Sequence, residues 1–257
     1  MNKLLLFCLA FVTIFIFQQN VWAKKDPAIL VFSKTKGYRH TAIEPGKKAI
    51  VDLGKIYHFN VDTTENADAF TESNLKKYAA VIFLSTTGDV LNDAQQAAFE
   101  RYIQAGGGFV GIHAASDTEY EWPWYGKLVG AYFLSHPKVQ EAKFIIKDKS
   151  HPSTSFLTDS VWMHTDELYN FKNINPDLKV LITIDETSYK GGENGKFHPF
   201  AWYHDYDGGR AFYTAMGHTK QVWSDEKFLK HLTGGIRYAI GKQKKLNYGK
   251  AKSKLIN

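Results

Sequence analysis

The sequence predicts an α/β domain: an open, mostly parallel, doubly wound sheet with helices on both faces, in three layers, extended by strand-rich insertions. Two observations carry this prediction. Short apolar runs alternate with amphipathic segments through the first half of the chain. That alternation gives strand, helix, strand, helix and strand within residues 28–113, a spacing that favours right-handed crossovers between parallel strands.

The first half holds four predicted strands and two predicted helices. The strands are apolar runs at residues 28–32, 58–61, 79–84 and 109–113. A helical pattern at 45–57 places Pro45 in the first turn, where the missing backbone N–H does no harm. Asn92 is predicted to cap the second helix, and the glycines at 106–108 are predicted to end it.

The second half is richer in strands. Predicted strands lie at 142–146, 179–184, 200–203 and 210–213. A closing helix is predicted at 225–240, where Phe228, Leu232 and Ile236 recur on one face. We expect these strands to form insertions in the sheet built by the first half of the chain. The sequence pattern alone does not show which strands pair with one another.

Residues 1–23 have the three parts of a signal peptide. Lys3 supplies a positive start, residues 4–17 form an apolar run of 14 residues, and Ala23 ends a plausible cleavage site. The run is shorter than the roughly 20 residues that a transmembrane helix needs. We therefore expect a secreted or periplasmic protein, without membrane insertion after signal cleavage; an uncleaved membrane anchor is the alternative.

Charge divides the remainder into a domain at 24–241 and a basic tail at 242–257. The chain has a net charge of +6. Six lysines stand in the tail, which has no acidic residue: Lys242, Lys244, Lys245, Lys250, Lys252 and Lys254. The domain itself is close to neutral, which argues against nucleic-acid binding. We expect the tail to be a solvated appendage.

Cysteine usage excludes several chemistries. Cys8, the single cysteine of the sequence, lies inside the predicted signal peptide. Cleavage after Ala23 leaves no thiol, which excludes disulfides, thiolate metal ligands and cysteine nucleophiles in the mature chain.

Polar loops follow three of the predicted strands, at 33–40, 85–89 and 113–117. Ligands of open parallel sheets bind beyond the carboxyl ends of the strands, so we expect the site there. Gly111 and His113 resemble a nucleophile elbow, with a histidine where class I glutamine amidotransferases hold a cysteine. The architecture is similar, but cysteine amidotransferase chemistry is excluded.

Ordered motifs across nearly the whole mature chain resemble the ThuA-like (trehalose utilisation) family. They are GYRH (37–40), GGGFVGIHAASDT (106–118), YGKLVGAYFLSHP (125–137), HPST (151–154), WMHTDELYNF (162–171) and HPFAWYHDYDGGRAFYTAMGHT (198–219). The resemblance implies a flavodoxin-like three-layer fold similar to that of class I glutamine amidotransferases. It also implies a role in carbohydrate metabolism, which in trehalose use includes oxidation of disaccharides to 3-keto derivatives.

Imidazoles and carboxylates in these motifs are the candidate site residues, because both suit acid–base chemistry and metal binding. Seven histidines lie in the motifs: His40, His113, His136, His151, His164, His204 and His218. The predicted catalytic residues are His113, Glu167, His218 and Arg210. The predicted substrate-binding residues are Tyr38, His40, Asp117, Trp202 and Tyr213. The predicted ligands of a divalent metal such as zinc are His40, His113, His136 and His218.

These residues favour an enzyme that acts on a sugar or a 3-keto-glycoside as a hydrolase, lyase or isomerase. The carbonyl of a keto sugar acidifies the neighbouring C–H, which a histidine or Glu167 can deprotonate while a cation or Arg210 stabilises the enolate. No nucleotide cofactor is expected, and the sequence leaves the oligomeric state open. The alternatives are a non-catalytic protein that binds carbohydrate or docks to a partner, and an envelope protein whose tail meets an acidic surface.

Overall fold

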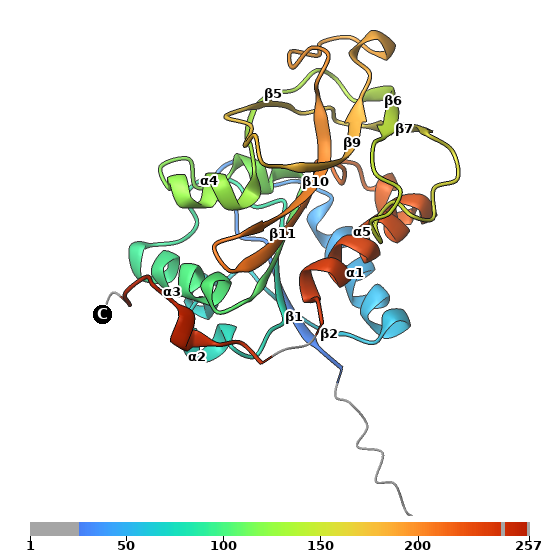
Figure 1. The fold of residues 1–257 in the computed structure, drawn as a ribbon. Coiled ribbons are helices and arrows are strands. Elements are labelled where there is room, and N and C mark those ends of the chain that lie inside the picture. Colours follow the sequence, from blue (N-terminus) through green and yellow to red (C-terminus); the bar gives the residue numbers. More distant parts are fainter. Residues whose placement is uncertain (1–25, 243–244, 256–257) are drawn as a thin grey trace, which may run out of the picture.

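The computed structural model describes residues 26–242 and 245–255 (Figure 1). The predicted signal peptide and Cys8 lie outside the described residues. Helices and strands follow in the order β1 (Ala28–Phe32), α1 (Ile43–Tyr57), β2 (Asn60–Thr64), α2 (Glu72–Leu75), β3 (Ala80–Leu84), α3 (Asp93–Gln104), β4 (Gly108–Ile112), α4 (Pro123–Val129), β5 (Tyr132–Ser135), β6 (Gln140–Ile146), β7 (Val161–Asp166), β8 (Asn170–Lys172), β9 (Lys179–Ile184), β10 (Pro199–Tyr206), β11 (Gly209–Thr214) and α5 (Glu226–Ile240).

One nine-stranded sheet has the order β2-β1-β3-β4-β11-β10-β9-β6-β7, and β5 and β8 form a separate pair. The half from β2 to β11 is parallel, as predicted. The predicted insertion strands continue the same sheet through antiparallel pairs. The direction changes at the tight turn of Asp207 and Gly208, both with positive φ, which joins β10 directly to β11. The sheet is therefore mixed, with the predicted parallel half continued by an antiparallel half.

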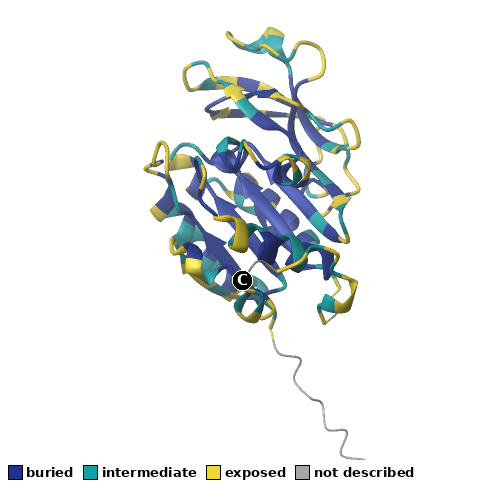
Figure 2. Cartoon of the chain, turned by 90° about the vertical axis from the view of Figure 1, so that its left-hand side faces the viewer, coloured by how far each residue is buried: buried dark blue, intermediate teal, exposed yellow. Residues whose placement is uncertain are grey.

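Helices cover both faces of the sheet, as a doubly wound fold requires. Helices α1 and α5 lie on one face, and α3 and α4 lie on the other (Figure 1). The central strands β3 and β4 are buried along their whole length, which explains their continuous apolar runs (Figure 2). Within the described ranges, no helix combines the length and the apolar character needed to cross a membrane.

The predicted caps and faces of the helices are present. Asn92 forms a capping box with Gln95 at the start of α3, and Pro45 lies in the first turn of α1. The inward face of α5 is fully buried at Phe228. Strand β2 begins later than predicted, because His58 adopts a left-handed conformation (φ 60°) as the C-cap of α1. That residue ends the helix and cannot continue into a strand.

The apolar pattern did not predict β5, β7, β8 or α4. Strand β7 alternates strictly between exposed and buried residues. Its buried positions, however, include the polar His164 and Asp166, whereas its exposed positions include Val161 and Met163. Polar residues thus occupy some buried positions and apolar residues some exposed ones. For this reason the hydrophobic pattern did not predict the strand.

The prediction of a solvated tail is wrong for the part that the structure describes. The Asn247 N–H donates to the Ala105 carbonyl at 2.9 Å. The side-chain oxygen of Gln104 accepts from the backbone N–H groups of Lys252 (2.7 Å) and Ser253 (3.0 Å). The tail therefore packs against α3 through its backbone, while the side chain of Lys252 stays exposed.

Candidate functional site

The site lies where the parallel strands β1, β4 and β11 end. His113 follows β4 directly and has φ 51°, an uncommon conformation for a residue with a side chain. The loops after β1 and β11 carry His40 and His218. Glu167 follows β7, which belongs to the antiparallel half of the sheet. Four segments that are distant in sequence therefore meet at one place, as the strand-end rule predicts.

His113 is the centre of this group and is fully buried. Its Nδ1–H donates to the Ala215 carbonyl at 2.9 Å, which leaves the Nε2 lone pair facing the cluster. That Nε2 lies 3.2 Å from His40 Nε2 and 3.1 Å from His218 Nδ1. Glu167 Oε2 lies 3.4 Å away. The Nε2 atom of His113 thus lies close to three polar groups at once. A single ring nitrogen cannot form a good hydrogen bond to all three.

Glu167 joins the remaining members. Its Oε2 lies 3.0 Å from His218 Nδ1, and its Oε1 lies 3.0 Å from His136 Nδ1. Glu167 is buried, whereas the His136 side chain is 44% exposed and forms the solvent side of the group. His136, one of the predicted metal ligands, therefore contacts the carboxylate from outside.

His40 closes the group from the loop after β1. It is 5% exposed, and its Nδ1 has no hydrogen-bond partner among the described residues. Tyr38, 65% exposed, stands edge-on to the His40 ring with centroids 4.8 Å apart. Tyr38 is therefore an exposed aromatic side chain beside the cluster.

The pKa values of three members of the cluster are shifted in different directions. Burial, together with the nearby His113 and His218, lowers the pKa of His40 to about 3, so this imidazole is neutral. Burial alone would raise the pKa of Glu167, but the hydrogen bonds and charges of His113 and His218 outweigh it and hold the pKa well below its usual value. Burial lowers the pKa of His218, yet Glu167 outweighs that effect and raises it overall.

The donor set fits a divalent cation. One ligand atom from each of His40, His113, Glu167 and His218 lies within 4.8 Å of every other. Tetrahedral zinc with bonds of about 2.0–2.1 Å to nitrogen and oxygen needs ligand atoms ~3.3 Å apart, which matches the four contacts of 3.0–3.4 Å given above. The two remaining pairs, of His40 with His218 and with Glu167, lie within 4.8 Å. Three imidazoles and one carboxylate are also ligand types that zinc prefers.

Other polar groups surround the cluster. Asp117 accepts a hydrogen bond of 2.7 Å from the Tyr120 hydroxyl, and burial raises the pKa of its carboxyl. The ring of Tyr169 lies 4.3 Å from that of His113, between centroids. Sequence reasoning missed Tyr169, although its place two residues after Glu167 was an available signal.

Two predicted substrate-binding residues belong to the core instead. Trp202 is fully buried, stacks on Tyr213 and donates its indole N–H to the Val129 carbonyl at 2.8 Å. Tyr213 is 1% exposed and donates its hydroxyl to the His113 carbonyl at 2.7 Å. Tyr213 therefore holds the backbone of His113 from within the core and does not face a ligand.

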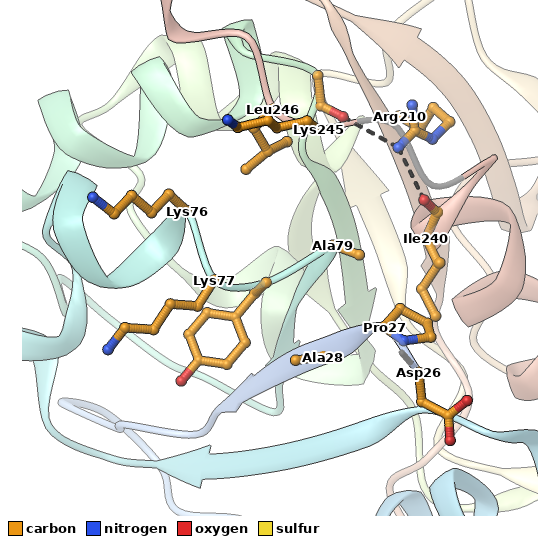
Figure 3. Close-up of a pocket in the computed structure, with 12 residues that line it drawn as sticks. Asp26, Pro27, Ala28, Lys76, Lys77, Ala79, Arg210, Ile240, Lys245 and Leu246 are labelled. Carbon is orange, nitrogen blue, oxygen red and sulfur yellow. Dashed lines mark hydrogen bonds between the residues drawn. The ribbon is translucent and has the colours of Figure 1, made fainter. Parts of the chain in front are cut away.

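Arg210 lies at the opposite end of the sheet. It begins β11 and is in register with Gly108 at the start of β4, whereas His113 follows the end of β4. Its guanidinium donates to the carbonyls of Gly106, Ala239 and Ile240 beside a pocket of about 320 Å³ (Figure 3). The expected role of Arg210 in stabilising an enolate does not agree with this position.

Three of the seven motif histidines also lie apart from the cluster. His151 bonds to Ser153, and His204 lies 3.0 Å from the Lys127 carbonyl. His164 lies 3.5 Å from Asp225, at the start of α5. Residue type alone could not separate these histidines from the four that converge.

Comparison with known families decides the relationship. The family model described as ThuA, trehalose utilisation, matches residues 28–239. The chain belongs to the ThuA family. This membership relates the protein to carbohydrate metabolism. A comparison with curated protein sequences gave no significant match.

Solved structures share the fold. A ThuA-like protein of Bacteroides uniformis is 24% identical, with a TM-score of 0.74 over 88% of this chain and 96% of the other. A ThuA-like protein of Parabacteroides merdae is 20% identical, with a TM-score of 0.67 over 84% and 90%. A β-galactosidase of Bacillus circulans is 12% identical, with a TM-score of 0.55 over 82% of this chain and 30% of the other. At these identities the likeness extends to the fold alone.

Proposed function

We propose that this ThuA-family protein is an exported enzyme that acts on a sugar or a 3-keto-glycoside. The observation that carries the proposal is the convergence of three imidazoles and one carboxylate, all within 4.8 Å, at the carboxyl ends of the parallel strands. Membership of a family linked to trehalose utilisation supports a carbohydrate substrate.

In this proposal His40, His113, Glu167 and His218 hold a divalent metal such as zinc. When bound, such an ion would supply Lewis-acid polarisation of a sugar carbonyl or hydroxyl oxygen. The protein fixes the His113 ring through its other nitrogen, because the Ala215 carbonyl accepts from Nδ1 and leaves Nε2 toward the cluster.

Proton transfer falls to the titratable groups around the cluster. Burial raises the pKa of Asp117 above its usual value, which favours a carboxyl that takes up and releases a proton. His136 is half-exposed and contacts Glu167, so it can pass protons between the cluster and solvent. We assign to these two side chains the removal and return of the proton next to a keto group, with Tyr38 packing against the sugar ring.

We further propose that the domain is built like that of the class I glutamine amidotransferases, with His113 at the elbow position. The positive φ of His113 and the parallel order β2-β1-β3-β4-β11 support this. With a histidine at this position, the elbow would provide a metal ligand in place of a nucleophile.

The test is metal content and proton exchange in the mature, untagged protein. We expect about one divalent ion per chain, and deuterium incorporation next to the carbonyl of a 3-keto-disaccharide in D₂O. His113→Ala should abolish both, and thermal unfolding is measured alongside because the fully buried side chain also contributes to packing. His58→Asn is the matched control, since His58 is 81% exposed and Asn tolerates its left-handed backbone.

Sugar binding without exchange or turnover would favour the alternative, a non-catalytic carbohydrate-binding protein. Full activity of His113→Ala would refute the site. Export is tested separately: amino-terminal sequencing of the protein recovered outside the cytoplasm should begin at Lys24.

A further inference from the structure

Asp166 is the last residue of β7, directly before Glu167, and is fully buried. Its carboxylate accepts three backbone N–H groups. Oδ2 accepts from Gly217 at 2.7 Å, and Oδ1 accepts from Thr219 at 3.2 Å and from Glu167 at 3.0 Å. Two of these amides flank His218, and the third belongs to Glu167.

The loop after β11 is also held by the Trp223 indole N–H, which donates to the Gly217 carbonyl at 3.1 Å. Gly217 has φ 120°, a conformation open to glycine and strained for other residues. His218 itself lies outside any helix or strand. Asp166 binds the amides on both sides of His218, so this carboxylate restrains the direction in which that imidazole leaves the backbone.

A buried carboxylate needs compensation beyond amide donors. His164 Nε2 lies 3.8 Å from Asp166 Oδ2, and His164 Nδ1 lies 3.5 Å from Asp225 Oδ2. Burial lowers the pKa of His164, but Asp166 and Asp225 outweigh it and raise the pKa overall. Asp225 also caps α5, accepting from Lys227 N–H at 2.8 Å. His164 therefore lies between Asp225 at the start of α5 and Asp166, within ion-pair distance of both, and its Nε2 forms no hydrogen bond among the described residues.

We propose that Asp166 is a positioning residue, which sets His218 and Glu167 at the separation that a divalent cation requires. This deepens the proposed function and rests on it as far as the cation is concerned. Residues that orient metal ligands typically change metal affinity by about 10–100-fold when replaced. We expect a loss of that size on replacing Asp166.

The variant is Asp166→Asn. Asparagine keeps the shape, but its NH₂ group must face a backbone N–H that the carboxylate previously accepted. The matched control is Asp185→Asn, because Asp185 accepts the Thr187 N–H at 3.0 Å in an exposed turn away from the site. Both variants lose one carboxylate that caps a turn.

The first measurement is amide hydrogen exchange by NMR on metal-free protein. In Asp166→Asn, exchange at Gly217 and Thr219 should accelerate at least ~10-fold, while Phe212 in β11 keeps its wild-type rate. The second is titration with Co²⁺, followed by its visible absorption. Asp166→Asn should bind about 10–100-fold more weakly than wild type, with an altered absorption band, and Asp185→Asn should match wild type.

The outcomes are distinguishable. Unchanged exchange at Gly217 and Thr219 overturns the proposal. Equal acceleration at Phe212 also overturns it, because Asp166 would then stabilise the whole fold instead of one loop. If wild type fails to bind Co²⁺, the metal part of the proposed function fails, while the exchange data still decide whether Asp166 fixes this loop. Faster exchange with unchanged Co²⁺ affinity and absorption refutes its role in setting the ligands.

Discussion

Replacing Tyr213 by Phe should destabilise the protein and disturb the cluster through the backbone of His113. The Tyr213 hydroxyl donates to the His113 carbonyl at 2.7 Å and lies 2.9 Å from the Ser116 hydroxyl. Phenylalanine keeps the ring that stacks on Trp202, with centroids 4.3 Å apart. The substitution therefore removes hydrogen bonds with little change in packing.

The magnitude follows from which groups lose their partners. All of these groups are buried, and a buried polar group left unpaired costs about 1–3 kcal/mol. The His113 carbonyl keeps one weaker contact, at 3.4 Å, with the Ser116 hydroxyl. That contact points to the lower part of the range, about 1–2 kcal/mol, or about 2–8 °C in Tm for a domain of this size.

Urea unfolding followed by tryptophan fluorescence measures this loss, with Tyr38→Phe as the control because Tyr38 is 65% exposed. Divalent-metal affinity should fall as well, since His113 has a positive φ that its backbone contacts must maintain. If the free energy of unfolding and the metal affinity both equal those of wild type, the Tyr213 hydroxyl does not support the site.

Three further predictions concern separate parts of the molecule. Replacing a residue that only orients a metal ligand lowers metal affinity by up to roughly 100-fold. Glu167→Gln should lower it by more than this, measured by competition with a chromogenic chelator. Gly235→Ala should cost about 1–3 kcal/mol in urea unfolding, because the added methyl would overlap the Phe212 ring. Burial lowers the pKa of His231 to about 3, so the unfolded state binds this proton more readily, and stability should fall as the pH drops below about 6.5. His231→Gln should reduce that fall by about 2 kcal/mol at pH 5, in unfolding curves between pH 7.5 and 5; an unchanged pH dependence would contradict the assignment.

Much of the parallel half of the sheet was predictable from sequence. Strand β1 has the predicted bounds, and the Asn92 cap and the buried face of α5 are as expected, because apolar period and capping are local signals. The strand-end rule also pointed to the loops of His40 and His113. Strand β7 was missed, since its buried positions include His164 and Asp166.

The sequence by itself therefore determined the α/β class, the family motifs and the residue types available for chemistry. Tertiary structure decided which of them meet. His151, His164 and His204 resemble the others in residue type and motif context, yet the antiparallel half carries them elsewhere while it brings Glu167 to His113. The side chains of Arg210 and Trp202 donate to backbone carbonyls away from the cluster. The register of β10 and β11 sets the end and the face of the sheet on which each side chain lies. The pairing of strands that are distant in sequence depends on tertiary packing, so a local sequence pattern does not predict it.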